Sequence, residues 1–302
     1  MIDNYKRYRG VVVPMASPFK KNGNPDRQST GRMLDFLLDN NTIPFILGTT
    51  GEGTSPSLRS REEFVSILLA HRRKGIPTIA GIIGLSHADT ITEANKYIML
   101  GLDAVVVTLP NYYMLNDRQI LQYFKSLSER IQGNMILYNI PKTIHMSIPL
   151  EVIEQLCKVQ NIIGIKDSEF DEARLEQSLK LWKGRTDFFH LTGVNKLMVK
   201  GLMYGSRGIV PSTGNFAPGL YSDIFKCCRE NKEEEAKDLL ERSQQYCDVY
   251  QANRSLASSL AALKLILAEM GLCERFVLPP LIECSNADAE EILLNYQKIV
   301  KL

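Results

Sequence analysis

The chain has 302 residues, 44% hydrophobic and 23% charged, a composition typical of a soluble globular protein. Its 36 basic and 34 acidic residues leave a formal charge of +2, which gives no reason to expect nucleic acid or an acidic membrane as a partner. Six cysteines without a C-x-x-C pair and four scattered histidines favour reduced thiols in a cytoplasmic protein, with no metal site. The polar start "MIDNYKRYRG" is no secretory signal, and the most apolar helical stretch carries Lys264 and Glu269, so we expect no membrane span.

Strand-like and helix-like segments alternate along the chain. The strand candidates are apolar extended runs, which lie in chain order at 10–19, 44–52, 77–82, 103–110, 134–141, 161–166, 188–193 and 207–215. Each is followed by a helical pattern, at 27–41, 60–73, 87–100, 117–130, 149–159, 171–182, 195–204 and 218–231. Runs such as "AVVV" and "NIIGI" are apolar without alternation, as strands covered on both faces require.

Eight consecutive strand–helix units predict an α/β fold of the (β/α)8 TIM-barrel type. The alternative is a doubly wound sheet, which has fewer strands and a glycine-rich phosphate turn after the first strand. Here that strand ends "VPMASPF", without G-x-G-x-x-G. Three further helices are predicted at about 232–250, 255–270 and 286–300. We therefore expect a catalytic barrel over 1–231 and a C-terminal helical extension over 232–302 that packs on it.

The candidate site follows from the barrel, because catalytic residues of this fold stand at the C-terminal ends of the strands. The side chains and backbone positions found at these ends are Thr49, Thr50, Tyr138, Lys166, Gly193 and Val210. A lysine, a tyrosine and two threonines, almost without carboxylate or histidine, suit amine chemistry better than hydrolysis.

Lys166 ends the apolar run "NIIGIKDS" (161–168), although lysine is rarely buried without a partner. An exposed lysine has a pKa of about 10.4 and is protonated at neutral pH. Desolvation in a barrel mouth lowers that pKa, and the neutral amine can then attack a ketone to form an imine. The alternative is an ion pair with Asp167 or another carboxylate, or a side chain that extends to water. Position alone does not separate the two.

For each of the neighbouring motifs, a structural and a functional interpretation are also possible. Tyr138 is either an ordinary core residue or a proton relay for imine chemistry. "GTTGE" (48–52) is either a strand-to-helix turn or an anion cradle of N–H groups and hydroxyls, suited to a carboxylate. In "LPNYYM", Tyr112 and Tyr113 pack at the rim, or one of them points into a site of the same or a neighbouring subunit. His145 is expected to be a loop residue.

Four motifs, "GTTGE", "YNIP", "GIKD" and "GNFAP", in this order and at these intervals, resemble the dihydrodipicolinate synthase / N-acetylneuraminate lyase family across nearly the whole chain. The resemblance implies a barrel with extra C-terminal helices and a homotetramer built as a dimer of dimers. It also implies class I aldolase chemistry through a lysine imine with pyruvate or another 2-keto acid. No metal or organic cofactor is expected.

The resemblance also implies roles for the catalytic residues. Lys166 matches the imine-forming lysine, Tyr138 the tyrosine that transfers protons, and Thr49 the threonine bonded to that tyrosine. Tyr113 is similar to the tyrosine donated across the tight-dimer interface, although its loop differs in length.

Other positions match residues that bind the substrate. Thr50 corresponds to the threonine that binds the pyruvate carboxylate, with Gly51 beside it in the cradle. Val210 occupies the strand-8 position whose carbonyl faces the lysine, and Gly193 ends strand 7.

Several positions differ from the family's sequence pattern, and these differences concern the substrate more than the mechanism. The synthase places an arginine two residues after the proline of its "YNxP" motif, where it binds a second carboxylate, and this chain has Thr143 there. Lys142 is adjacent but lacks the guanidinium fork. A histidine, His145, stands where most members have glycine, and Val194–Asn195 replace acidic residues that bind substrate hydroxyls in many members.

The leading hypothesis is therefore a lyase that forms or cleaves a bond between pyruvate and an aldehyde, with a 2-keto-3-deoxy sugar acid or a sialic-acid-like compound as substrate. "GNFAP" (214–218) resembles members that cleave such sugar acids. The alternatives are dihydrodipicolinate synthase or a dehydratase, which use the same imine. A keto-acid-binding regulatory protein is the non-enzymatic alternative, but it would be expected to have lost the lysine or the tyrosine.

Overall fold

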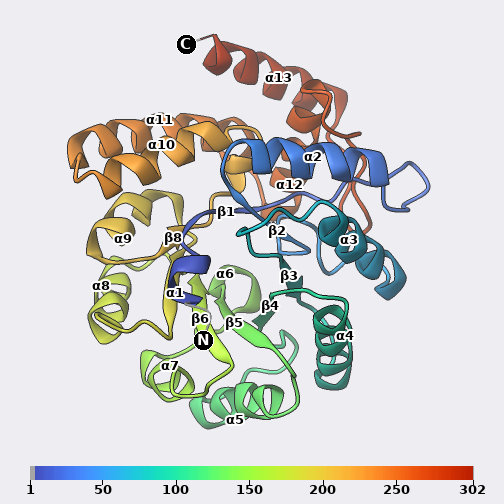
Figure 1. Cartoon of the computed structure of the whole chain (residues 1–302). Helices are drawn as coiled ribbons and strands as arrows, with labels where there is room; N and C mark the ends of the chain where they lie inside the picture. Colours follow the sequence, from blue (N-terminus) through green and yellow to red (C-terminus); the bar gives the residue numbers. More distant parts are fainter. Residues whose placement is uncertain (1–3, 302) are drawn as a thin grey trace.

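The computed structural model describes residues 4–301, across which eight parallel strands close into a barrel in the order β1 to β8 (Figure 1). The strands are β1 (Gly10–Pro14), β2 (Ile43–Ile46), β3 (Ile79–Ile82), β4 (Ala104–Thr108), β5 (Asn134–Asn139), β6 (Ile162–Asp167), β7 (Phe189–Thr192) and β8 (Gly208–Ile209). Pairing of β8 with β1 closes the ring. The predicted (β/α)8 barrel with additional C-terminal helices is thus confirmed.

Helices surround the barrel and continue beyond it. Those within the barrel sequence are α1 (Asn4–Arg7), α2 (Arg27–Asp39), α3 (Leu58–Ala70), α4 (His87–Met99), α5 (Asp117–Ser128), α6 (Pro141–Ile144), α7 (Leu150–Leu156), α8 (Glu172–Leu181), α9 (Met198–Tyr204) and α10 (Pro218–Arg229), with 3₁₀ turns η1 (Asn195–Leu197) and η2 (Ser212–Asn215). The chain continues with α11 (Glu233–Gln251), α12 (Leu256–Glu269) and α13 (Asn286–Val300). Helices α2, α3, α4, α5, α8, α12 and α13 each begin after an Asp, Ser or Asn whose side chain accepts a backbone N–H of the first turn.

Several predicted elements differ from the observed ones. The run 207–215 forms only a two-residue strand, because the chain turns into η2 directly after the barrel closes. The run 44–52 likewise leaves the sheet at Ile46, and its "GTTGE" part forms a turn. The short helices α1 and α6 were not predicted. The end of β2 is hard to locate in this sequence because the turn that follows it is also mostly buried.

Side chains alternate between two hydrophobic layers, as a barrel strand requires. Val12 points into the barrel, where it joins Phe45 and other inward side chains, whereas Val11 and Val13 pack against the surrounding helices. On β6 the alternation is shifted, because Ile162 pairs with Met135 and Gly164 with Ile136, which leaves Ile163 as an extra residue. After this bulge, Lys166 is the register partner of Tyr138.

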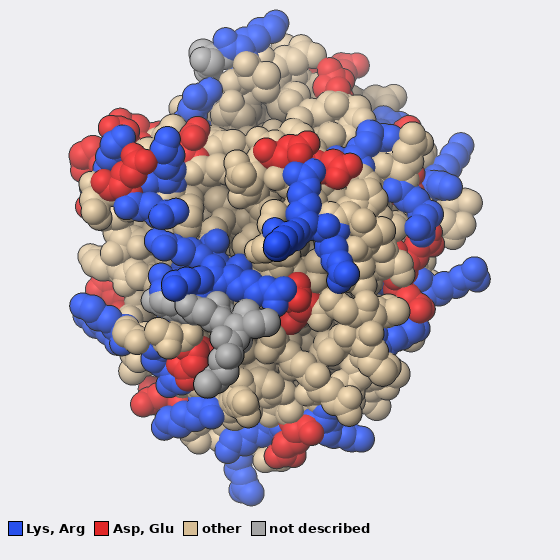
Figure 2. Space-filling model, in the orientation of Figure 1, with Lys and Arg blue, Asp and Glu red and all other residues tan. Residues whose placement is uncertain are grey.

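Helix α1 lies at the N-terminal end of the barrel, which faces the viewer in Figure 1. Tyr8, which follows α1, enters the barrel and stacks on Phe189 with ring centroids 5.1 Å apart. Figure 2 shows the same face, where Lys and Arg gather over the centre and acidic and basic side chains are mixed around the rim. The mouth at the C-terminal strand ends lies on the opposite side.

The last three helices pack against the barrel and each other. Helix α11 contacts α10, α12 and α13, and Figure 1 shows these helices together with α2 on one side of the barrel. Among residues 4–301, no helix combines the length and hydropathy needed to cross a lipid bilayer.

Candidate active site

Lys166 lies in the barrel mouth and is only 5% exposed. Its Nζ lies 3.9 Å from the centroid of the Tyr138 ring and 5.1 Å from that of Phe45. Within the described part of the chain no carboxylate forms an ion pair with it. The amine is thus held against two aromatic faces, without a carboxylate partner among the described residues.

The neighbouring Asp167 points to the outer side of the sheet, which excludes it as the partner of Lys166. One of its carboxylate oxygens lies 3.0 Å from Arg174 Nε, and the other accepts the Asn139 amide at 2.8 Å. Arg174 Nη2 also donates to the Ile148 carbonyl at 2.8 Å. Asp167 and Arg174 therefore fix the ends of β5 and β6 from outside, a role that the sequence reading did not assign to them.

Tyr138 is buried, and its hydroxyl lies 3.2 Å from Thr49 Oγ1, at hydrogen-bonding distance. Thr49 follows β2, so the contact joins residues from opposite sides of the mouth. The predicted pair of tyrosine and threonine thus lies together, with the tyrosine ring against Lys166.

Thr50 and Gly51 continue the turn after β2. Thr50 faces the same cavity as Lys166, whereas Gly51 lies beneath the turn, where its carbonyl accepts the Ser17 hydroxyl at 2.6 Å. A Cβ at Gly51 would lie 2.8 Å from the Met15 carbonyl oxygen, so only glycine fits at this position. Asn215, in the "GNFAP" motif, holds the end of β1 by accepting the Ala16 N–H and donating to the Pro14 carbonyl.

The cavity at this mouth has a volume of about 250 Å³. It is lined by Pro14, Thr49, Thr50, Tyr138, Ile140, Lys142, Thr143, Lys166, Ser168, Gly193, Val210, Ser212, Tyr250, Gln251, Arg254, Leu256, Ser259 and Leu260. The predicted residues Thr143, Gly193 and Val210 therefore lie on its wall. Tyr250, Gln251 and Arg254 also lie on the wall. They were not predicted from the sequence, because the rule for barrels locates site residues at strand ends, and these three belong to the C-terminal extension.

A second cavity of about 260 Å³ adjoins the first and shares Thr49 and Thr143 with it. Its further lining includes several hydroxyl and amide side chains, namely Thr54, Ser55, Thr108 and Asn111. A ligand bound at Lys166 therefore has two directions in which to extend, toward Arg254 or across Thr143.

Tyr113, His145 and Asn195, which the sequence singled out, do not line the Lys166 cavity. Tyr113 is 72% exposed and packs edge-on against Tyr112. His145 is exposed and ends α6 in a left-handed conformation with φ of 59°. Asn195 faces α10 and α11, accepting the Tyr221 hydroxyl at 2.9 Å and donating to Ser243.

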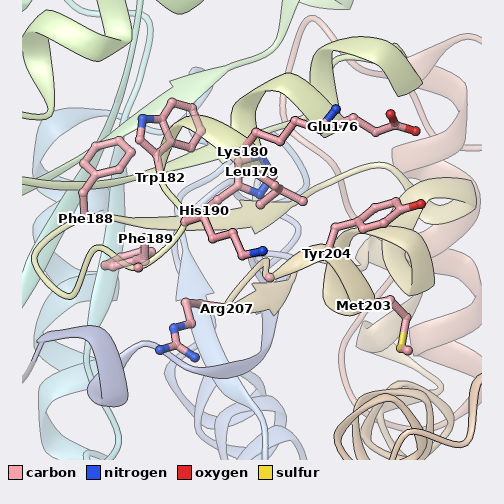
Figure 3. A pocket seen from close by; sticks show the side chains of 13 residues that line it. Glu176, Leu179, Lys180, Trp182, Phe188, Phe189, His190, Met203, Tyr204 and Arg207 are labelled. Atoms are coloured by element: carbon pink, nitrogen blue, oxygen red, sulfur yellow. The ribbon is translucent and has the colours of Figure 1, made fainter.

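A larger cavity, of about 570 Å³, lies elsewhere, between α8 and α9 (Figure 3). Trp182, His190 and Tyr204 contribute to its wall, and it shares no residue with the cavity of Lys166. Burial lowers the pKa of His190 to about 4, so this imidazole is neutral at physiological pH.

No group of three or more His, Cys, Asp or Glu residues in the described chain is arranged to hold a metal ion.

A (β/α)8 barrel with a buried lysine at its C-terminal mouth, beside a tyrosine and without an ion-pair partner in residues 4–301, has the architecture of a class I aldolase. Residues 7–299 match the model of the dihydrodipicolinate synthetase family. The chain therefore belongs to this family, whose members are class I lyases and aldolases that form or cleave carbon–carbon bonds.

Individual relatives agree with this assignment. A 4-hydroxy-tetrahydrodipicolinate synthase of Sulfurihydrogenibium sp. is 29% identical over 94% of this chain and 96% of the relative. An uncharacterised DapA-like lyase of Pyrococcus furiosus is 30% identical, over 97% and 96% respectively. Among solved structures, a catalytic-lysine mutant of a sialic acid aldolase from Ruminococcus gnavus superposes with a TM-score of 0.88 at 21% identity, over 98% and 96% of the two chains, which shows a shared fold.

Proposed function

We propose that this enzyme forms and cleaves the bond between pyruvate and an aldehyde through an imine on Lys166. The observation that carries the proposal is the position of Lys166: its Nζ is buried at the barrel mouth, 3.9 Å from the Tyr138 ring centroid. Asp167 binds Arg174, and no carboxylate among residues 4–301 forms an ion pair with this nitrogen.

The reaction follows from the chemistry of the imine. The neutral amine attacks the ketone carbon of a 2-keto acid to give a carbinolamine. Protonation of its hydroxyl and loss of water then give a protonated imine that withdraws electrons from the adjacent carbon. In the cleavage direction the C4 hydroxyl loses its proton, the C3–C4 bond breaks, and the aldehyde leaves an enamine behind. Protonation of the enamine at C3 and hydrolysis then release pyruvate and restore the lysine. Condensation reverses these steps.

Each proton transfer needs an acid or base close to the imine, and we assign this role to Tyr138 because of its position. Its ring lies against the Lys166 amine, and its hydroxyl is 3.2 Å from Thr49 Oγ1, through which a proton can be passed on. Thr50, on the cavity wall, supplies a hydroxyl for the carboxylate of the keto acid.

For the aldehyde part we propose a polyhydroxylated chain, as in a 2-keto-3-deoxy sugar acid or a sialic-acid-like compound. The adjoining cavity supports this proposal, because Thr54, Ser55, Thr108 and Asn111 offer hydrogen bonds there. The one charged side chain that lines it among the described residues, Glu52, is paired with Lys264. The structural neighbour from Ruminococcus gnavus, named a sialic acid aldolase, has the same fold.

Dihydrodipicolinate synthase activity is the second candidate, and a specific observation favours it. Lys142 and Arg254 line the Lys166 cavity, whereas no Asp or Glu does so among the described residues. Arg254 can therefore bind the second carboxylate that Thr143 cannot, and curated relatives carry the synthase name. Pyruvate release from sugar acids, compared with the condensation of pyruvate and aspartate semialdehyde, distinguishes the two candidates.

The assembly we propose is a homotetramer, a dimer of dimers in which each subunit donates Tyr113 to its partner's site. The support is the position of this side chain, which is 72% exposed and absent from the lining of its own cavity. Sedimentation velocity over a dilution series measures the assembly, and a Tyr113→Phe variant that loses activity while remaining tetrameric is the expected result. A fully active monomer would contradict it.

The imine itself is tested by borohydride reduction in the presence of pyruvate, followed by mass spectrometry of the peptides. The wild-type enzyme is expected to gain one stable adduct, located on Lys166. Lys166→Ala is expected to gain none, and Lys264→Arg, at the other buried lysine, serves as a control that keeps the adduct. A wild-type enzyme without adduct at saturating pyruvate would overturn the proposed function.

A further inference from the structure

A buried ion pair joins the turn after β2 to the C-terminal extension. The Lys264 Nζ lies 2.9 Å from the Glu52 Oε1, and the two side chains are 1% and 0% exposed. Glu52 closes the "GTTGE" motif, two residues after Thr50, and Lys264 belongs to α12. The pair therefore connects the carboxylate-binding turn with a helix more than 200 residues away.

Both members of the pair have further partners. The second carboxylate oxygen of Glu52 accepts the Leu278 N–H at 2.9 Å, and Lys264 Nζ donates to the Phe276 carbonyl at 2.8 Å. The ammonium also lies 4.7 Å from the centroid of the Phe19 ring. Unlike a surface ion pair, which contributes little, this one is desolvated, and removal of one partner leaves a buried uncompensated charge.

The backbone of the turn needs such an anchor. Glu52 has a φ of 54°, a left-handed conformation that a residue with a side chain seldom adopts without tertiary support. Its N–H donates to the Thr49 carbonyl at 3.1 Å, so the conformation of Glu52 and that of Thr49–Thr50 are coupled within one hydrogen-bonded turn. The buried carboxylate of Glu52 therefore anchors the backbone segment that carries Thr50.

The same helix forms part of the cavity wall. Leu256, Leu260 and Lys264 are spaced by four residues, so they share one face of α12. The first two line the cavity of Lys166, and the third holds the turn from behind. This face of α12 thus touches the candidate site at two places.

We propose that Lys264 is a positioning residue, which holds Thr50 through Glu52 in the orientation that binds the keto-acid carboxylate. This makes the C-terminal extension a functional part of the active site. The proposal rests on the imine function proposed above and assigns a role to a residue that touches neither substrate nor Lys166.

The test measures the pyruvate concentration that gives half-maximal borohydride trapping, and repeats the measurement with acetone, a carbonyl compound without a carboxylate. In Lys264→Met and Glu52→Gln we expect the half-saturating pyruvate concentration to rise by roughly tenfold, the equivalent of one lost hydrogen bond to a charged group. The value for acetone should stay within about twofold of that of the wild type, because Lys166 itself is untouched. Lys264→Arg, which keeps the charge, should restore much of the pyruvate affinity.

A matched control separates positioning from loss of stability. Leu127→Ala creates a cavity on α5, which Figure 1 shows across the barrel from α12. This variant should have a lower melting temperature but unchanged half-saturating concentrations of pyruvate and acetone. If a single variant does not fold, the charge-neutral double variant Glu52→Gln/Lys264→Met is compared in the same way. Unchanged pyruvate affinity in the folded variants, or an equal loss for pyruvate and acetone, would overturn the proposal. A wild-type enzyme without any pyruvate adduct overturns the imine function as well.

Discussion

Tyr138 and Lys166 are register partners on β5 and β6, and the lysine nitrogen lies 3.9 Å from the centroid of the tyrosine ring. The bulge at Ile163 brings about this pairing, because it shifts β6 by one residue relative to β5. A one-residue difference in register would turn Lys166 out of the barrel and bring Asp167 in. The geometry of the proposed chemistry therefore depends on one irregularity in the sheet.

Removal of the Tyr138 hydroxyl tests its role in proton transfer. Tyr138→Phe keeps the ring against Lys166 and removes only the oxygen that contacts Thr49. We expect turnover, measured as pyruvate release, to fall by about 100-fold or more, the usual contribution of a positioned acid or base. The adduct should still form with pyruvate, but more slowly. A variant with wild-type turnover would exclude Tyr138 as the proton carrier.

Thr49→Val tests the contact from the other side. The substitution keeps the shape of the side chain and removes the hydroxyl 3.2 Å from the Tyr138 oxygen. Loss of one hydrogen bond of about 1 kcal/mol predicts a fall in turnover of roughly fivefold, much smaller than that of Tyr138→Phe. In the double variant the two losses should not add, because Thr49 acts through the tyrosine. Additive losses, measured in the same assay, would show that Thr49 acts independently.

The parts of this site that follow strand ends were predictable from the sequence, and the parts that come from elsewhere were not. Lys166 and Tyr138 each end an apolar run, so the barrel rule brings them together. Arg254 lies in the connection between α11 and α12, and Lys264 lies in α12. For these helices a helical pattern indicates which face is packed but not which surface it packs against. The sequence could not predict that the Asp167 side chain points outward either, because this direction depends on the bulge in β6 and on Arg174, seven residues later.

Arg254 is expected to select aldehydes that carry a negative charge. Its guanidinium is partly held by the Val249 and Ala252 carbonyls and by the exposed Glu291, 3.5 Å away, which leaves donors for a ligand in the cavity. In Arg254→Gln we expect condensation of pyruvate with aspartate semialdehyde to fall by about tenfold or more relative to an uncharged aldehyde such as glyceraldehyde. Lys142→Gln, at the exposed rim, should have a smaller effect. Equal losses for both aldehydes would assign Arg254 a structural role instead.

The stability of the fold should depend on pH through His190. Burial lowers its pKa from the ordinary 6.5 to about 4, an effect increased by Arg174 and partly opposed by Asp167. Between these two values the unfolded chain binds a proton that the folded one does not, so the free energy of unfolding is complete above pH 6.5 and falls as the pH is lowered toward 4. The pKa difference corresponds to about 3 kcal/mol. Urea unfolding at several pH values measures this fall, and His190→Phe, which keeps a ring beside Trp182, should reduce it by that amount. A variant with the same pH dependence as the wild type would assign the acid sensitivity to other groups.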